Sequence, residues 1–264
     1  MTAPEDEFAR ELEVFRSEAE EAICFFYAYF AIQMEASRKK DVLRILNQAP
    51  YFWMTVQSAL QTSALIVLGR IFDEDSNHNM NRILKIGQSH IEMFSKTALA
   101  DRKRKVSTSA DEWLPEYLDQ VYVPVPDDFR RLRKHVAKRR QIYNSIYHNL
   151  RNKVFAHKEI SDKAIIQGMF QKIKVSEFQQ LLVFPMRLQN ALWELFHNGH
   201  KPVLRPVRYS GDHIRKQPSP QFRPRELQEL LICETRRFLG LLSELDQRRS
   251  LENTPQRRVP KRGH

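Results

Sequence analysis

Glycine and cysteine are scarce in this chain of 264 residues, which contains seven glycines and two cysteines. An α/β nucleotide-binding fold or a β-sandwich normally has more glycine and more alternating Val-rich segments. The sequence is rich instead in Leu, Glu, Arg, Lys, Gln and Ala, all of which favour helices. This composition predicts an all-α fold, and a hydrophobic content of 42% is enough for a sizeable core.

The two cysteines, Cys24 and Cys233, lie far apart and neither has a CxxC neighbour, so neither a zinc site nor a disulfide framework is indicated. No histidines show ligand spacing, and Walker and GxGxxG motifs are missing, so we expect no metal and no cofactor. The most apolar stretch, 22–34, is too short to span a membrane, and the N-terminus is acidic, unlike a secretory signal. We therefore expect a cytoplasmic protein.

Positive charge is concentrated at the C-terminal end of the chain. Residues 201–264 carry 15 Lys/Arg and 7 Asp/Glu, and therefore +8 of the net charge of +11. This asymmetry favours an acidic partner such as nucleic acid. The alternative is a tail that only increases solubility.

Apolar residues recur at steps of three and four in several segments, which indicates amphipathic helices. We predict an antiparallel helical bundle at 1–199, a Pro/Arg-rich linker arm at 200–224, an extra C-terminal amphipathic helix at 225–249 and a disordered basic tail at 250–264. Within the bundle the predicted helices cover 4–40, 50–72, 81–94, 127–157 and 176–198, with a loop at 102–109 and an extended segment at 121–126.

A polar motif stands near the end of the fourth predicted helix, in the segment YHNLRNKVFAHKEI at 147–160. Arg151 is followed by Asn152, and His157 lies six residues after the arginine. The segment resembles the Arg-x(4–6)-His motif of the HEPN superfamily, and its wording is closest to the phage abortive-infection branch. The earlier segment LGRIFD at 68–73, followed by a polar connector and a short helix, also resembles that branch.

The resemblance covers approximately residues 5–198 and implies a helical bundle that dimerises across the motif-bearing helix. It also implies a metal-independent ribonuclease in many members, and a non-catalytic binding module in others. The motif of this branch often has an acidic residue two positions after the histidine, and Glu159 occupies that position here.

The chemistry of these side chains fits RNA cleavage without a metal. His157 titrates near neutrality and can give or accept a proton. Arg151 supplies a fixed charge and a forked set of donors suited to phosphate. Asn152 can orient a phosphate or the imidazole, and Asp73 and Glu74 can orient Arg151 from a neighbouring helix end. The alternative is that His157 and Arg151 are ordinary charges near a helix C-terminus and that Asp73 belongs to a polar turn.

The motif-bearing helix also presents many basic residues, either as an RNA-binding surface or as a solvated helix face. The candidate nucleic-acid-binding residues are Arg133, Lys134, Arg140 and Lys153.

The sequence therefore predicts an HEPN-type endoribonuclease that acts in phage defence or as a toxin, with RNA as substrate and an antitoxin or defence-system protein as a further partner. On an ideal helix Arg151 and His157 lie about 120° apart, so they share a face only if the helix ends or kinks between them or the long arginine side chain bridges the gap. Because the resemblance also implies dimerisation through this region, we expect a homodimer in which two subunits pool these residues. The alternatives are a non-catalytic HEPN module and a structural scaffold. A buried or salt-bridged motif pair would favour the module.

Overall fold

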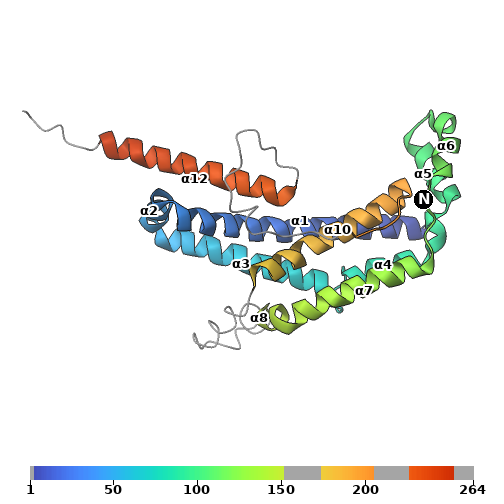
Figure 1. Cartoon of the computed structure of the whole chain (residues 1–264), viewed down its shortest axis with the longest axis horizontal. Coiled ribbons are helices and arrows are strands. Elements are labelled where there is room, and N and C mark those ends of the chain that lie inside the picture. Colours follow the sequence, from blue (N-terminus) through green and yellow to red (C-terminus); the bar gives the residue numbers. More distant parts are fainter. Residues whose placement is uncertain (1–2, 152–173, 205–225, 253–264) are drawn as a thin grey trace, which may run out of the picture. The chain divides into compact units, whose positions relative to one another are not determined.

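The computed structural model describes residues 3–151, 174–204 and 226–252, and in these ranges every regular element is a helix (Figure 1). The predicted all-α fold is confirmed for these residues. None of their helices is long and apolar enough to cross a membrane. Most of the predicted linker arm, and the basic tail from 253 onward, lie outside the described residues.

The chain divides into two compact units, each assembled from two separate stretches of sequence. The first unit combines Met1–Ile23 with Thr62–His213, and the second combines Cys24–Gln61 with Ile214–His264. The sequence had predicted contiguous segments instead.

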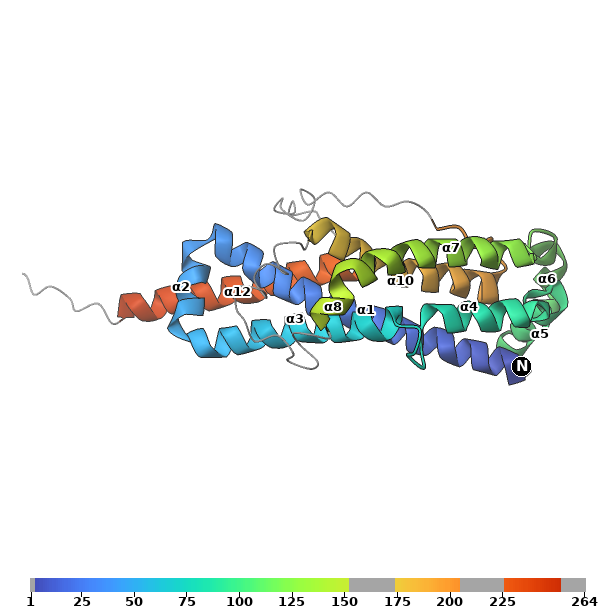
Figure 2. The same cartoon turned by 90° about the horizontal axis from the view of Figure 1, so that it is seen from below.

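The first unit contains the beginning of α1 and the end of α3, followed by all the elements up to α10. Figure 2 shows α4 and α7 side by side, and the two helices contact each other closely. Phe8, Phe94 and Phe196 pack together in the core, with ring centroids 5.1–6.0 Å apart. The elements are α1 (Ala3–Arg38), α3 (Pro50–Phe72), α4 (Met80–Ser89), η1 (Ile91–Phe94), α5 (Lys96–Val106), α6 (Ala110–Asp119), α7 (Pro126–Ile142), η2 (Tyr143–Tyr147), α8 (His148–Leu150) and α10 (Val175–Asn198).

Two local predictions in this unit were wrong. The predicted helix at 81–94 is divided into α4 and η1, and Asn79 caps α4, because its side chain accepts hydrogen bonds from the backbone N–H groups of Asn81 and Arg82. The predicted loop at 102–109 includes the end of α5, where Arg102 is buried. Its guanidinium donates to Glu5 and to the carbonyl of Phe196 at 2.5 and 2.8 Å. The basic run of the predicted loop, which we expected to face solvent, therefore begins with a buried residue.

The start of α7 also differs from the prediction, which assigned Pro126 to the extended segment at 121–126 and started the helix at 127. Pro126 is the first helical residue and Val125 is the N-cap. The buried Asp128 carboxylate accepts from the Val125 backbone N–H at 2.9 Å and from the Tyr122 hydroxyl at 2.6 Å. Asp128 thus caps the helix from its third position, as the acidic member of a capping box does.

The end of α10 agrees with the sequence. Gly199 follows the helix with φ of 62°, a left-handed conformation that glycine adopts without strain. The predicted end of this helix at 198 is therefore confirmed.

The second unit consists of the end of α1, α2 (Lys40–Gln48), the start of α3 and α12 (Leu227–Glu252). The sequence did not predict α2 as a separate helix. The small core of this unit joins Ile32, Val42, Leu46 and Leu239. The predicted C-terminal amphipathic helix is confirmed as α12, which packs against α2 and forms an ion pair with α1 through Arg236 and Glu35 at 2.7 Å.

Candidate functional site

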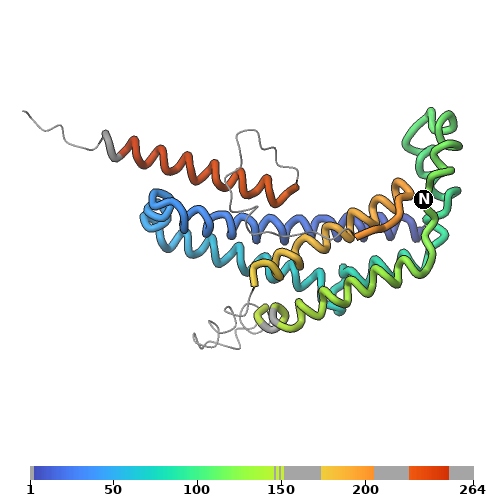
Figure 3. Tube along the Cα trace, viewed as in Figure 1, coloured from blue at the N-terminus to red at the C-terminus, as the bar shows by residue number. Residues whose placement is uncertain are grey.

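The helix that carries the motif arginine changes its winding just before the arginine. α7, seen as a continuous tube in Figure 3, leads into a π-helical turn, η2, and then into α8, which Arg151 follows directly in the sequence. Tyr143 and Tyr147 at the ends of η2, and Leu150 in α8, are fully buried. A π-turn adds a residue to the helical path and is frequent at functional sites. Here only the short α8 separates it from the arginine of the motif.

Arg151 is held by the residue that follows the end of α3. Its guanidinium forms an ion pair and hydrogen bond with the Asp73 carboxylate. The two side chains are 20% and 21% exposed, so the pair lies at the edge of the fold rather than in its core. Both residues were candidates from the sequence, and the structure brings them together.

Gly69, one helical turn before Asp73, leaves the space that the Arg151 side chain occupies. A Cβ atom on Gly69 would lie 2.6 Å from Cδ and 2.9 Å from Cζ of Arg151. Such distances are too short for carbon atoms without a shift of the arginine. Gly69 therefore permits the close approach of the guanidinium to the α3 backbone.

A second arginine fixes the same helix end. Arg140, on α7, donates from Nε to the carbonyl of Phe72 at 3.0 Å and forms an ion pair with Glu74. Its side chain is 14% exposed. Asp73 and Glu74, which follow α3, therefore each bind one arginine of the continuous helical run α7–η2–α8, called here the α7–α8 rod. These two ion pairs fix the end of α3 against the rod.

The buried phenol of Tyr143 lies against the end of α3. Its ring stacks on Phe72 with centroids 5.3 Å apart. Burial raises the pKa of Tyr143 well above its ordinary value, and the Asp73 carboxylate raises it further, while Arg151 acts in the opposite direction. Tyr143 therefore stays neutral beside the Asp73–Arg151 pair at physiological pH.

The other candidate residues divide into two groups. Asn152, Lys153, His157 and Glu159 lie outside the described residues. Among the basic residues of α7, Lys134 is exposed and Arg133 is half-buried, and within the described ranges neither forms an ion pair. The described residues contain no group of three His, Cys, Asp or Glu side chains placed to hold a metal ion.

Sequence reasoning missed two contributors to the site, Gly69 and Tyr143. The signal for Gly69 was available, because an isolated glycine inside a helical pattern of a glycine-poor chain often has a packing reason. Nothing comparable marked Tyr143, which could equally have been any aromatic core residue.

Comparison with protein families adds independent evidence. The model of the HEPN-type family AbiU2 matches residues 5–214, a range that includes α3, the α7–α8 rod and α10. No curated protein and no solved structure matched the chain in the corresponding searches. Because the match extends over most of the chain, and over the elements that build the Asp73–Arg151 pair, this protein belongs to the AbiU2 family of HEPN proteins.

Proposed function

We propose that this protein is a metal-independent endoribonuclease that acts in the cytoplasm in abortive infection. The observation that carries the proposal is the position of Arg151, which Asp73 and Gly69 hold at the start of the Arg-Asn-x(4)-His sequence. A pre-oriented guanidinium loses little conformational freedom when it binds phosphate, which makes it suited to stabilising a transition state.

The proposed reaction uses the side chains of the motif. His157 exchanges a proton with the ribose 2′-hydroxyl or the leaving 5′-oxygen, and a second acid or base completes the transfer. The 2′-oxygen attacks phosphorus, the bond to the 5′-oxygen breaks, and a 2′,3′-cyclic phosphate and a 5′-hydroxyl result. Arg151 neutralises the charge on the phosphorane, and Asn152 orients the phosphate or the imidazole.

A homodimer is part of this proposal. Two subunits that meet along the α7 helix and the segment following it would supply two copies of Arg151 and His157 to one cleft. The exposed Lys134 and the half-buried Arg133 would then guide RNA towards that cleft. An antitoxin or another defence-system protein would control the activity.

The decisive experiment is incubation of the purified protein with total RNA, with and without EDTA. We expect cleavage in both conditions, and a decrease of about two orders of magnitude or more in His157→Ala and Arg151→Ala. His135→Ala is a matched control, because His135 is exposed on α7 and has no assigned role. Arg151→Lys should remain strongly impaired, since lysine keeps the charge but lacks the fork. Cleavage by His157→Ala at the wild-type rate would contradict the assignment.

A non-catalytic binding module is the second candidate, and one observation favours it. Carboxylates already neutralise both Arg151 and Arg140, as expected of arginines that hold a fold together. This module would bind RNA without cutting it, and Arg151→Ala would lower its stability rather than any rate. RNA binding without cleavage by fresh wild-type protein would therefore favour the module.

A further inference from the structure

α12 carries two apolar stripes, and its own chain buries one of them. Ile232 and Leu239 lie on the buried stripe and pack within the second unit. Phe238, Leu241 and Leu245 lie on the other stripe and are 52%, 51% and 62% exposed. Large apolar side chains gathered on one exposed helix face are typical of an interaction surface.

The exposed stripe has the spacing of a helix-pairing seam. Glu234, Phe238, Leu241, Leu245 and Arg248 follow one another at steps of four and three residues, and all five are exposed. This is the repeat with which one helix meets another along its length. The seam consists of an apolar centre with an acidic residue at one end and a basic residue at the other.

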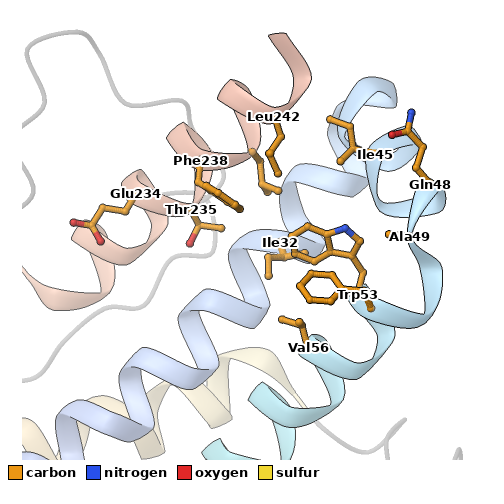
Figure 4. A pocket seen from close by; sticks show the side chains of 12 residues that line it. Ile32, Ile45, Gln48, Ala49, Trp53, Val56, Glu234, Thr235, Phe238 and Leu242 are labelled. Atoms are coloured by element: carbon orange, nitrogen blue, oxygen red, sulfur yellow. The ribbon is translucent and has the colours of Figure 1, made fainter. Parts of the chain in front are cut away.

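An apolar groove of about 740 Å³ lies directly beside the seam, and Phe238 belongs to both. Figure 4 shows Phe238 and Leu242 of α12 on one side of this groove, with Ile32 and Trp53 on the other. All the residues that line it belong to the second unit. The surface therefore offers both projecting side chains and a depression, as self-complementary interfaces require.

Opposite charges stand at equal distances on either side of the centre of the seam. Glu234 and Arg248 each lie seven residues from Leu241, which corresponds to about 10.5 Å along the helix axis. Neither forms an ion pair within the described residues. Arg237 and Glu244 along the adjoining edge of the helix, both exposed, repeat the pattern with the opposite order of charge.

We propose that this face of α12 pairs in antiparallel orientation with α12 of a second copy of the chain, about a two-fold axis near Leu241. Phe238 then meets Leu241 and Leu245 of the other copy, and Glu234 comes within reach of the other copy's Arg248, twice. Parallel pairing would place glutamate against glutamate and arginine against arginine, which is unfavourable. The charge pattern therefore fits α12 of a second copy and favours the antiparallel over the parallel orientation.

This surface is independent of the proposed ribonuclease site. The family match ends at residue 214, whereas α12 begins at Leu227. The α12 pairing thus belongs to the part of the chain outside the matched region, and it neither requires nor excludes a dimer formed along α7.

The test exploits the two-fold symmetry through charge reversal in the full-length protein. Glu234→Arg alone sets arginine against arginine, and Arg248→Glu alone sets glutamate against glutamate. A mixed pair of the two variants restores both attractions. We co-express the variants with different affinity tags and compare mixed with like-with-like recovery. We expect mixed pairs in about three- to tenfold excess, since two exposed charge pairs change sign.

Two controls make the result specific. Lys105→Glu and Glu116→Arg reverse exposed charges in the first unit and should show no preference between mixed and like pairs. A dimer formed through α7 alone recovers all combinations equally, so an excess of mixed pairs reports pairing through α12 even where α7 also dimerises. Leu241→Asp, added to both charge variants, should abolish the preference without loss of helicity, because Leu241 is half exposed. Equal recovery of mixed and like pairs, or no recovery of either, overturns the proposal.

Discussion

At the scale of single residues, the space above Gly69 controls the position of Arg151. We expect Gly69→Ala to displace the guanidinium from Asp73, because the new methyl group would occupy its place. Under the proposed mechanism, displacement of a positioned group by about 1 Å costs approximately two orders of magnitude in rate. RNA cleavage by Gly69→Ala should decrease accordingly, while its thermal unfolding changes little.

Gly240→Ala is the matched control for this prediction. A Cβ atom on Gly240 meets nothing within 4 Å, so the substitution should only favour the helix, by up to about 1 kcal/mol. It should leave cleavage unchanged. A Gly69→Ala variant that cuts RNA as fast as Gly240→Ala would show that the contact with Arg151 has no part in catalysis.

The ion pair of Asp73 with Arg151 shows how much of the candidate site the residue types alone could predict. Their chemistry suggested that a carboxylate at the end of one helix could orient an arginine on another. Proximity itself depends on the packing of Phe72 on Tyr143 and on the room at Gly69, which are properties of the assembled fold. The sequence alone therefore named both partners but favoured a polar turn as the interpretation of Asp73.

At the scale of elements, the start of α7 depends on one buried carboxylate. Asp128→Ala should lower the free energy of unfolding by about 2 kcal/mol, because the Val125 N–H and the Tyr122 hydroxyl both lose their acceptor. Chemical denaturation at pH 7 measures this loss. Asp127→Ala, at an exposed neighbouring position, is the control and should have a much smaller effect.

The contribution of Asp128 should also depend on pH. Burial alone would raise the pKa of this carboxyl, but the hydrogen bonds from Tyr122 and Val125 and the charge of Arg131 outweigh burial and lower it. A lowered pKa stabilises the fold above the ordinary value for aspartate, and this stabilisation is lost as the pH falls through the lowered value. The stability difference between wild type and Asp128→Asn should therefore shrink below about pH 4. A constant difference from pH 7 to pH 3 would contradict this account.

The limits of the prediction at this scale have a physical cause. Hydrophobic periodicity located α3 at its observed ends, because a proline starts the helix and a polar run follows it. It failed at 102–109, because the buried Arg102 meets Glu5 and a carbonyl group from distant parts of the chain. No local pattern reveals that a charged side chain has such partners.

At the scale of the whole molecule, the basic C-terminal end should add electrostatic affinity for RNA. Deleting the residues after Glu252 removes four Lys/Arg. Each neutralised phosphate releases counterions, so the deletion should reduce the dependence of log K on log salt by roughly one to three units. Salt titrations of RNA binding by full-length and truncated protein measure this change. Identical slopes would indicate that the tail only increases solubility.

The division of the chain into two compact units could not be predicted from sequence patterns. The helices of the second unit follow from amphipathic periodicity, but their grouping does not, since Leu239 joins Ile32 and Val42 across some two hundred residues. Composition predicts contiguous segments, because it describes neighbours along the sequence and carries no information about which distant segments pack together.

This interleaving restricts how the protein can be divided or recombined. α1 continues from the first unit into the second at Ile23, and α3 returns from the second to the first at Thr62. A fragment that stops after α10 keeps most of the first unit but leaves the inner faces of α1 and α2 without Leu239 and Leu242. Neither unit can be inherited, exchanged or expressed as one continuous stretch of gene, so α12 must be kept together with the helices on which it packs.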